Sequence, residues 1–138
     1  MIIRRNTGSL SARLQALGIT LLLAAAGCGD DNPDPQLGTI TPAELNDALQ
    51  AKDFLLINVH VPNAGEIPGT DTHIPYDDIE ALVAYIGTDL DTPVVIYCLS
   101  DTMTLIAGPE LVDRGYRDVR YLTGGMTAWT QAGYTLDP

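Results

Sequence analysis

Cys98 is the residue with the clearest capacity for chemistry, because it directly follows the apolar run Val94 to Tyr97. That run has the composition of a buried parallel strand, and a helix is expected from Leu105. Ligands of open α/β sheets bind beyond the carboxyl ends of the strands, which is where Cys98 would lie. Free N–H groups at a helix start favour negative charge and would stabilise a thiolate or a persulfide. An inert, buried cysteine is the alternative.

The loop between Cys98 and the expected helix is polar but carries no Lys or Arg. Its hydroxyl groups can donate hydrogen bonds to an anion. Asp101 either caps the helix or opposes an anionic ligand through its charge. The candidate substrate-binding residues of this loop are Leu99, Ser100, Asp101, Thr102, Met103 and Thr104.

Strands and helices alternate in the pattern of the remaining residues. Thr41 is expected as the N-cap of a first helix, with Pro42 at N1 and Glu44 closing a capping box. Pro109 lies inside an expected helix and should kink or shorten it. The predicted strands are 54–59, 93–97 and 119–122, and the predicted helices are 41–51, 77–86, 105–114 and 126–131, with a loop at 61–75. This order predicts an α/β fold with a mainly parallel central sheet and helices on both faces.

Length and charge narrow the classes of function. The 138 residues suit one domain, and 7 basic against 18 acidic side chains give a formal net charge of −11. A protein that binds nucleic acid needs a basic surface, so no nucleic-acid partner is expected. Two cysteines and two histidines argue against a disulfide framework and against a zinc or His-rich site, so no metal is expected.

The first residues have the layout of an export signal. Arg4, Arg5 and Arg13 precede the apolar run 17–26, and no acidic residue lies before residue 28. The run is shorter than the ~20 apolar residues that a membrane-spanning helix needs. Removal of residues 1–27 would leave 4 basic and 18 acidic side chains, a net charge of 4 − 18 = −14. A chain of this charge does not steer free anions toward itself.

The junction Ala25-Ala26-Gly27-Cys28 resembles a bacterial lipobox. The resemblance implies cleavage before Cys28 and lipid attachment to this residue, and the polar stretch 28–38 reads as a flexible linker. Several acyl chains on one residue anchor a protein stably to a membrane. An Asp directly after the cysteine would resemble the inner-membrane retention signal of enteric bacteria. Gly29 stands there instead, which favours the outer membrane over the inner one. A lipid-anchored protein of the bacterial envelope, with its domain facing the periplasm or the exterior, is therefore expected. Soluble secretion is the alternative.

Two segments carry a pattern known from one family. The segment from Leu111 to Trp129 contains Gly-Tyr, Val, Leu, Gly-Gly and Ala-Trp elements at regular spacing. The segment Val94-Val95-Ile96-Tyr97-Cys98 is a strand that leads into a cysteine, and Ile67-Pro68-Gly69 is a further element. In type and spacing these segments resemble a rhodanese-like domain, with Cys98 at the position of its catalytic cysteine. The resemblance covers residues 39–138 and implies the rhodanese-like fold there.

This resemblance implies sulfur transfer without a metal or an organic cofactor. Cys98 would attack the outer sulfur of a small donor, such as thiosulfate or a polysulfide, or of a protein persulfide. The resulting Cys98 persulfide would pass its sulfur to a thiol, or to cyanide in an assay. The backbone N–H groups of residues 99–104 would hold the persulfide, as a helix N-terminus holds an anion.

At the site, the chain departs from the family. The family loop often reads Cys-Arg-x-Gly-x-Arg-Ser, whereas Leu99 and Met103 stand at the arginine positions and Asp101 at the glycine position. Each charge close to the Cys98 thiol can shift the pKa of the thiol by about a unit or more. Asp101 also bears on the backbone shape of the loop, because Asp tolerates a positive φ less readily than Gly. Asn58 and His60 replace the Asp and Arg of an Asp-Val-Arg motif. His60 is a candidate accessory residue, cationic only if its pKa is raised.

Two functions from different classes follow from these departures. A neutral loop suits a polysulfide or a protein persulfide better than thiosulfate, so sulfur transfer would use a less charged donor. The alternative is a rhodanese-like binding module with little or no turnover that recognises a partner at the membrane surface. A cysteine phosphatase or arsenate reductase would need an arginine in the loop to hold its oxyanion, and residues 99–104 contain none.

Overall fold

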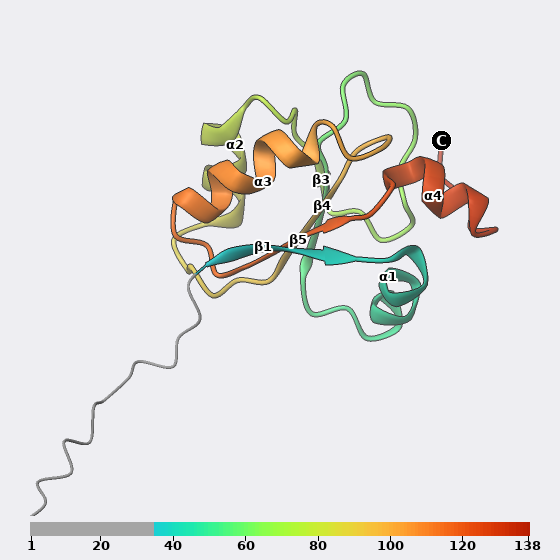
Figure 1. The fold of residues 1–138 in the computed structure, drawn as a ribbon, viewed down its shortest axis with the longest axis horizontal. Coiled ribbons are helices and arrows are strands. Elements are labelled where there is room, and N and C mark those ends of the chain that lie inside the picture. The colour runs from blue at the N-terminus through green and yellow to red at the C-terminus, as the bar shows by residue number, and fades with distance from the viewer. Residues whose placement is uncertain (1–34) are drawn as a thin grey trace, which may run out of the picture. The chain divides into compact units, whose positions relative to one another are not determined.

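The computed structural model describes residues 35–138, in which five parallel strands form one sheet of order β1-β5-β4-β2-β3 (Figure 1). The strands are β1 (Gln36–Ile40), β2 (Leu55–Asn58), β3 (Thr72–His73), β4 (Val94–Tyr97) and β5 (Asp118–Leu122). The helices are α1 (Pro42–Ala48), the 3-10 turn η1 (Leu49–Ala51), α2 (Ile79–Ile86), α3 (Thr104–Asp113) and α4 (Gly125–Gln131). Because the strands are parallel, all their carboxyl ends meet at one edge, the carboxyl edge, and their amino ends meet at the opposite amino edge.

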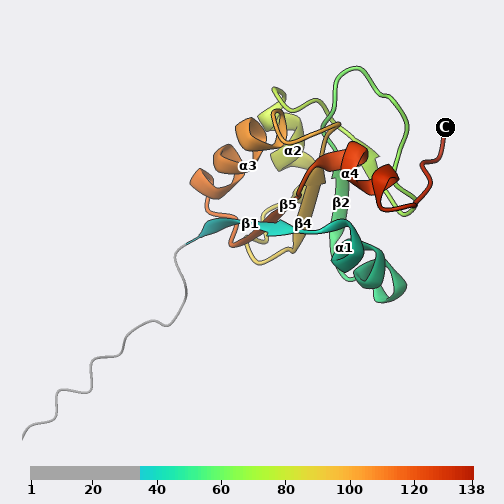
Figure 2. The same ribbon diagram turned by 45° about the vertical axis from the view of Figure 1, so that its right-hand side comes forward.

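Helices cover both faces of the sheet, and each face has its own apolar core (Figures 1 and 2). Helices α2 and α3 pack on the face that carries Val94 and Ile96 of β4. Helices α1 and α4 pack on the face that carries Val95 and Tyr97. All four β4 side chains are buried, as expected for a central parallel strand. The predicted α/β fold with helices on both faces is therefore confirmed.

Local signals placed the main elements correctly. The backbone N–H of Thr41 donates to Glu44 Oε2 over 2.9 Å, and the Glu44 N–H donates to Thr41 Oγ1 over 3.3 Å. This confirms the capping box of α1. The Thr41 N–H and the Thr41 hydroxyl both donate to Glu44 Oε2, and these two bonds lower the pKa of Glu44. Strands β2, β4 and β5 and helices α2, α3 and α4 each lie within one or two residues of their predicted ranges.

The sequence prediction missed the two outermost strands of the sheet, β1 and β3. Strand β1 includes residues 36–38, which the sequence assigned to the linker 28–38, so that boundary was wrong for these three residues. They pair in parallel with β5, from Gln36 beside Asp118 to Ile40 beside Leu122. Strand β3 lies inside the predicted loop 61–75 and pairs with β2. Both strands depend on a partner far away in the chain, which local periodicity does not report.

Pro109 does not shorten α3, which runs from Thr104 to Asp113. Proline leaves the carbonyl four residues earlier, that of Leu105, without an intrahelical hydrogen bond. Leu105 and Pro109 both lie on the exposed side of α3, where such a carbonyl can face solvent. The expected shortening was therefore wrong, because the disrupted bond lies away from the core.

Candidate functional site

Cys98 lies at the carboxyl edge, directly after β4, and only 1% of its surface is exposed. The Val59 N–H donates to the Tyr97 carbonyl over 2.8 Å, which ties the end of β2 to the strand end that precedes Cys98. Cys98 Sγ donates to the Ser100 carbonyl over 3.1 Å. The thiol is thus buried against its own loop.

The first turn of α4 forms backbone hydrogen bonds with the Cys98 loop. The Met126 N–H donates to the Cys98 carbonyl over 2.9 Å, and the Thr127 N–H donates to the Leu99 carbonyl over 3.0 Å. Gly125 has φ +57°, and a Cβ at this position would lie 2.3 Å from the Cys98 carbonyl oxygen. Only glycine fits this close approach, which explains why the second residue of the Gly-Gly element is a glycine.

In the Cys98 loop the backbone carbonyls accept hydrogen bonds, whereas the backbone N–H groups donate none to the described residues. The carbonyls of Cys98, Leu99, Ser100 and Asp101 each accept a hydrogen bond. Within residues 35–138, no acceptor binds the backbone N–H groups of residues 99–104. These consecutive donors follow the thiol directly, and such a series is the arrangement that backbone anion sites use.

Asp101 joins the loop to α4. Its Oδ1 accepts a hydrogen bond from the Gly124 N–H over 2.7 Å, at the N-cap of α4. The expectation that its side chain caps the following helix α3 was wrong, although its carbonyl accepts from Thr104 Oγ1 and from the Leu105 N–H. No non-glycine residue in the described range has a positive φ, so Asp101 fits the glycine position without backbone strain.

His60 follows β2 and is 9% exposed. The neighbouring residues place it beside the Cys98 loop: Val59 bonds the end of β4, and the Val61 N–H donates to Met103 Sδ over 3.4 Å. His60 Nδ1 is buried and has no hydrogen-bond partner within residues 35–138, while its carbonyl lies 2.6 Å from His73 Nε2. A buried ring nitrogen without a partner has the capacity for a hydrogen bond to a ligand.

Two residues that support the site were given no supporting role from the sequence. Asn58 is fully buried; its Oδ1 accepts from the His60 N–H, and its Nδ2 donates to the Gly65 carbonyl. Tyr97 is also fully buried, and its hydroxyl accepts from the Ile67 N–H over 3.1 Å. Burial raises the pKa of Tyr97. Buried polar groups inside apolar strands were the available signal, since such groups need partners.

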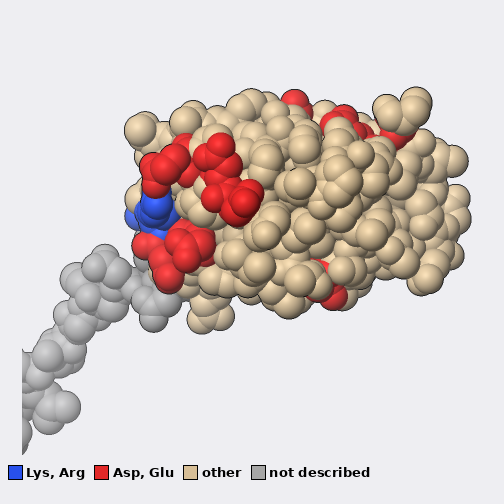
Figure 3. Space-filling view, turned by 90° about the horizontal axis from the view of Figure 1, so that it is seen from above, with Lys and Arg blue, Asp and Glu red and all other residues tan. Residues whose placement is uncertain are grey.

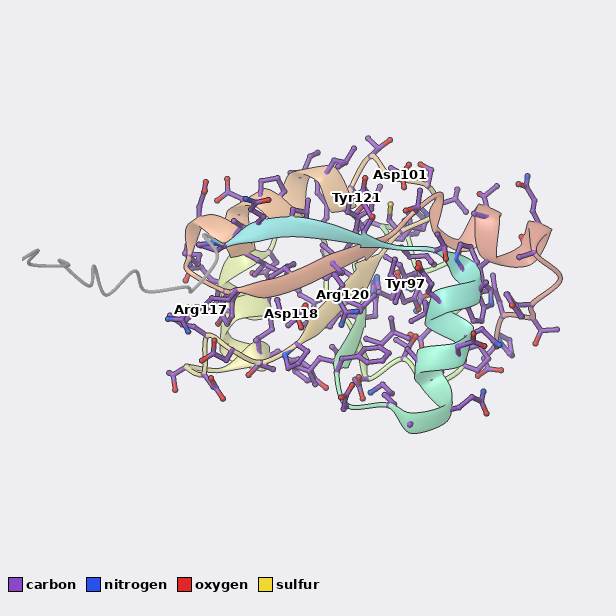
Figure 4. The ribbon with its side chains drawn as sticks, turned by 60° about the horizontal axis from the view of Figure 1, so that its bottom comes forward. Tyr97, Asp101, Arg117, Asp118, Arg120 and Tyr121 are labelled. Carbon is purple, nitrogen blue, oxygen red and sulfur yellow. The ribbon has the colours of Figure 1, made fainter. Side chains whose placement is uncertain are left out.

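The basic residues of the described range lie away from Cys98. Lys52 and Arg117 precede β2 and β5 at the amino edge, and their ion pairs with Asp71 and Asp91 each measure 2.6 Å. Figure 4 shows Arg117 and Asp101 toward opposite ends of the sheet, with Arg120 between them.

The other two arginines are also paired. Arg114 follows α3 and pairs with Glu80 over 2.6 Å, an interaction that lowers the pKa of Glu80. Arg120 Nε lies 3.1 Å from Asp118, an ion pair without hydrogen-bond geometry. In Figure 3 the visible Lys and Arg atoms lie at the left-hand end between acidic side chains, and further acidic atoms appear along the upper and lower edges. The fold therefore does not rebuild the missing loop arginines.

Two other classes of site were searched for in the described part of the chain. It contains no group of three His, Cys, Asp or Glu side chains that could hold a metal ion. None of its helices is long and apolar enough to cross a membrane. Cys28, the expected lipidation residue, and the expected signal 1–27 lie outside the described residues.

Comparison with known proteins decides the family. The family model of the rhodanese-like domain matches residues 41–132. The chain belongs to the rhodanese-like family. Cys98, its loop and the Gly124-Gly125 turn that supports them all fall within the matched residues of this rhodanese-like chain.

Two curated relatives are thiosulfate sulfurtransferases named GlpE. The one from Pseudoalteromonas translucida is 28% identical over 96 residues, which cover 67% of this chain and 89% of the relative. The one from Pseudomonas syringae is 32% identical over 92 residues, which cover 64% of this chain and 83% of the relative. The chain thus belongs to the rhodanese-like sulfurtransferase family.

Among solved structures, a rhodanese-like domain protein from Staphylococcus aureus has a TM-score of 0.61 to this chain. The two are 24% identical, and the match covers 73% of this chain and 99% of the other. At this identity the likeness supports the fold alone. It agrees with the parallel sheet and the two helical layers described above.

Proposed function

We propose that this rhodanese-like protein transfers sulfur through a persulfide on Cys98. The observation that carries the proposal is the pairing of a buried thiol with the unengaged N–H groups of residues 99–104. These donors are available to a thiolate or a persulfide after the Sγ–Ser100 bond has opened.

Atoms and electrons balance in the proposed step without an added oxidant. The Cys98 thiol releases its proton to solvent, and Sγ forms a bond to the outer sulfur of the donor. The bond between that sulfur and the rest of the donor breaks, and the donor remnant leaves with the electron pair. An acceptor thiolate then attacks the outer sulfur, and Cys98 leaves as a thiolate.

We infer that the donor places less negative charge beside Cys98 than thiosulfate does. In the described residues, no basic side chain lies at the carboxyl edge beside Cys98, while Asp101 adds a carboxylate to the loop. A thiosulfate dianion would gain no ion pair there, whereas each missing cation removes an attraction of about 1 kcal/mol or more. A polysulfide or a protein persulfide suits this loop better.

The test is intact-protein mass spectrometry of the full chain after separate treatment with thiosulfate and with polysulfide. A Cys28→Ser background leaves Cys98 as the sole cysteine, and Cys98→Ser in the same background is the matched control. We expect an added sulfur atom that requires Cys98, forms faster with polysulfide, and is removed by cyanide or a thiol. No added sulfur on folded, reduced protein from either donor would overturn the proposal.

A second candidate function is a binding module with little or no turnover. The observation that favours it is the deep burial of Cys98, whose thiol already has a hydrogen-bond acceptor at Ser100. A buried thiol of this kind is inert unless the loop opens. Slow or absent alkylation of Cys98 by iodoacetamide in the folded chain, together with no sulfur loading, would support this function over transfer.

We also propose that the chain is attached to the bacterial envelope through lipid on Cys28. The lipobox-like sequence supports this location, and β1 starts at the amino edge, opposite Cys98. Cys28→Ser should abolish lipid labelling and release the protein from the membrane fraction; unchanged membrane retention of this variant would count against the anchor.

A further inference from the structure

Exposed apolar side chains concentrate beside Cys98. The described residues contain five large exposed apolar side chains, and one of them, Tyr85, lies on the last turn of α2 near the amino edge. The other four belong to the loops after β2 and β4 and to the first turn of α3. They are Val61 (40% exposed), Leu99 (45%), Leu105 (49%) and Ile106 (49%), and we call them the collar.

The collar is built around the loop that carries the thiol. Leu99 directly follows Cys98, and the Val61 N–H bond to Met103 Sδ joins the β2 loop to the start of α3. Single exposed apolar residues are normal on a protein surface, but a group of them at one place marks a binding site. The grouping around the loop that carries the thiol indicates a ligand that binds at this loop.

The charges near the collar restrict the ligand further. The four basic residues of the described range pair with Asp71, Glu80, Asp91 and Asp118, whereas Asp101 adds a carboxylate to the Cys98 loop. The Asp101 side chain accepts a hydrogen bond from the Gly124 N–H. This field disfavours an anionic ligand and gives an uncharged apolar ligand no penalty.

We propose that the collar binds the alkyl part of an uncharged apolar thiol, which accepts the sulfur. The proposal rests on the proposed function. The thiol loses its proton to solvent, its sulfur bonds to the outer sulfur of the Cys98 persulfide, and the S–S bond to Sγ breaks. Cys98 leaves as a thiolate with the electron pair, and the product is an alkyl persulfide.

The expected effect follows from the apolar surface that the collar can cover. Burial of one methylene favours binding by a factor of up to about four. The rate constant for sulfur removal should therefore rise about two- to fourfold per methylene from ethanethiol to hexanethiol. Mercaptoacetate, which adds a carboxylate to a short thiol, should react more slowly than ethanethiol at the same thiolate concentration.

The experiment uses the full chain with Cys28→Ser, loaded with sulfur by polysulfide, and follows the loss of the added sulfur by mass. Each thiol is compared at equal thiolate concentration. Leu99→Ser and Ile106→Ser each remove a collar side chain, and Tyr85→Ser is the matched control because it removes an apolar side chain of similar exposure at the other edge.

Support requires that the wild-type chain and the Tyr85→Ser variant show the rise with chain length and that both collar variants flatten it. A rate constant independent of chain length in the wild-type chain would overturn the proposal. An equal rise in wild-type and collar variants would also overturn it, because the alkyl group would then bind elsewhere.

Failure of the proposed function is distinguishable from failure of the collar. If no sulfur loads on Cys98, sulfur transfer fails, and the collar is tested with a series of alkyl 2-pyridyl disulfides, which form a mixed disulfide with a thiol directly. A rise of this rate with chain length that the collar variants remove would support an apolar-ligand collar without sulfur transfer. A flat series would overturn the collar as well.

Discussion

The two edges of the sheet differ in how they use charge and burial. At the amino edge, Lys52 and Arg117 form ion pairs with exposed or half-exposed acids. At the carboxyl edge, a buried thiol is held by backbone hydrogen bonds and is bordered by apolar side chains. Solvated ion pairs contribute little to stability and suit a surface without a ligand. An edge that exposes apolar groups and leaves N–H groups unengaged is instead the arrangement that the proposed ligand site requires.

Gly125→Ala should have the largest effect, because it would break the carboxyl edge. Its Cβ would lie 2.3 Å from the Cys98 carbonyl oxygen, at a backbone angle of φ +57°. We expect a loss of about 2–4 kcal/mol in the free energy of unfolding, from overpacking and strain together. Urea unfolding measures it. Gly133→Ala is the control, since its φ is also positive but nothing lies within 4 Å of its Cβ, and an equal loss in both variants would contradict the close approach as the cause.

Tyr97→Phe should have the next largest effect. It leaves the buried Ile67 N–H without an acceptor, which costs about 1–3 kcal/mol. Urea unfolding at neutral pH tests this cost, with Tyr85→Phe on the surface as the control. A cost no greater than that of Tyr85→Phe would show that the hydroxyl does not support the carboxyl edge.

Tyr97 also predicts a dependence of stability on alkaline pH. Because burial raises its pKa in the folded chain above that in the unfolded chain, its contribution is complete below about pH 10 and is lost as the pH rises through the folded value. Tyr97→Phe should therefore lose less stability between about pH 10 and 12 than the wild-type chain. Urea unfolding over this range measures the difference, and parallel curves would contradict the assignment.

Leu99→Arg should make the carboxyl edge resemble a cationic site. An arginine next to Cys98 attracts a dianion, so we expect loading by thiosulfate to speed up about three- to tenfold, with little change for a neutral trisulfide. Initial rates of sulfur addition measured by mass test this. Thr88→Arg adds the same charge at the amino edge, and an equal acceleration in both variants would point to net charge rather than to the site.

Arg117→Met should have the smallest effect. It removes an ion pair in which 36% of the arginine and 70% of the Asp91 side chain are exposed. Solvent screening limits the loss of stability to less than about 1 kcal/mol, and added salt should reduce it further. A loss as large as that of Tyr97→Phe would contradict the distinction between the two edges.

Several features follow from local sequence alone. The continuous apolar run of β4 predicts a buried parallel strand, and Thr41 with Glu44 predicts the start of α1. The position of Cys98 after that strand also follows, because parallel strands share one carboxyl edge. Patterns of this kind are encoded within a few residues and are readable without the fold.

Other features exist only in the tertiary structure. Asp101 and Gly124 form a hydrogen bond although they are 23 residues apart in the sequence. The Tyr97 hydroxyl accepts from the Ile67 N–H, which is 30 residues away. Strand β1 forms because β5 provides its hydrogen-bond partners, although residues 36–38 carry no strand pattern of their own.

The sequence by itself determined the family, the fold class and the nucleophile that the proposal uses, because periodicity, caps and motif spacing are local. Only the tertiary structure decided what surrounds Cys98: the Gly125 contact, the unengaged N–H groups and the four collar residues. The physical reason is that burial, hydrogen-bond satisfaction and charge separation depend on which distant segments meet.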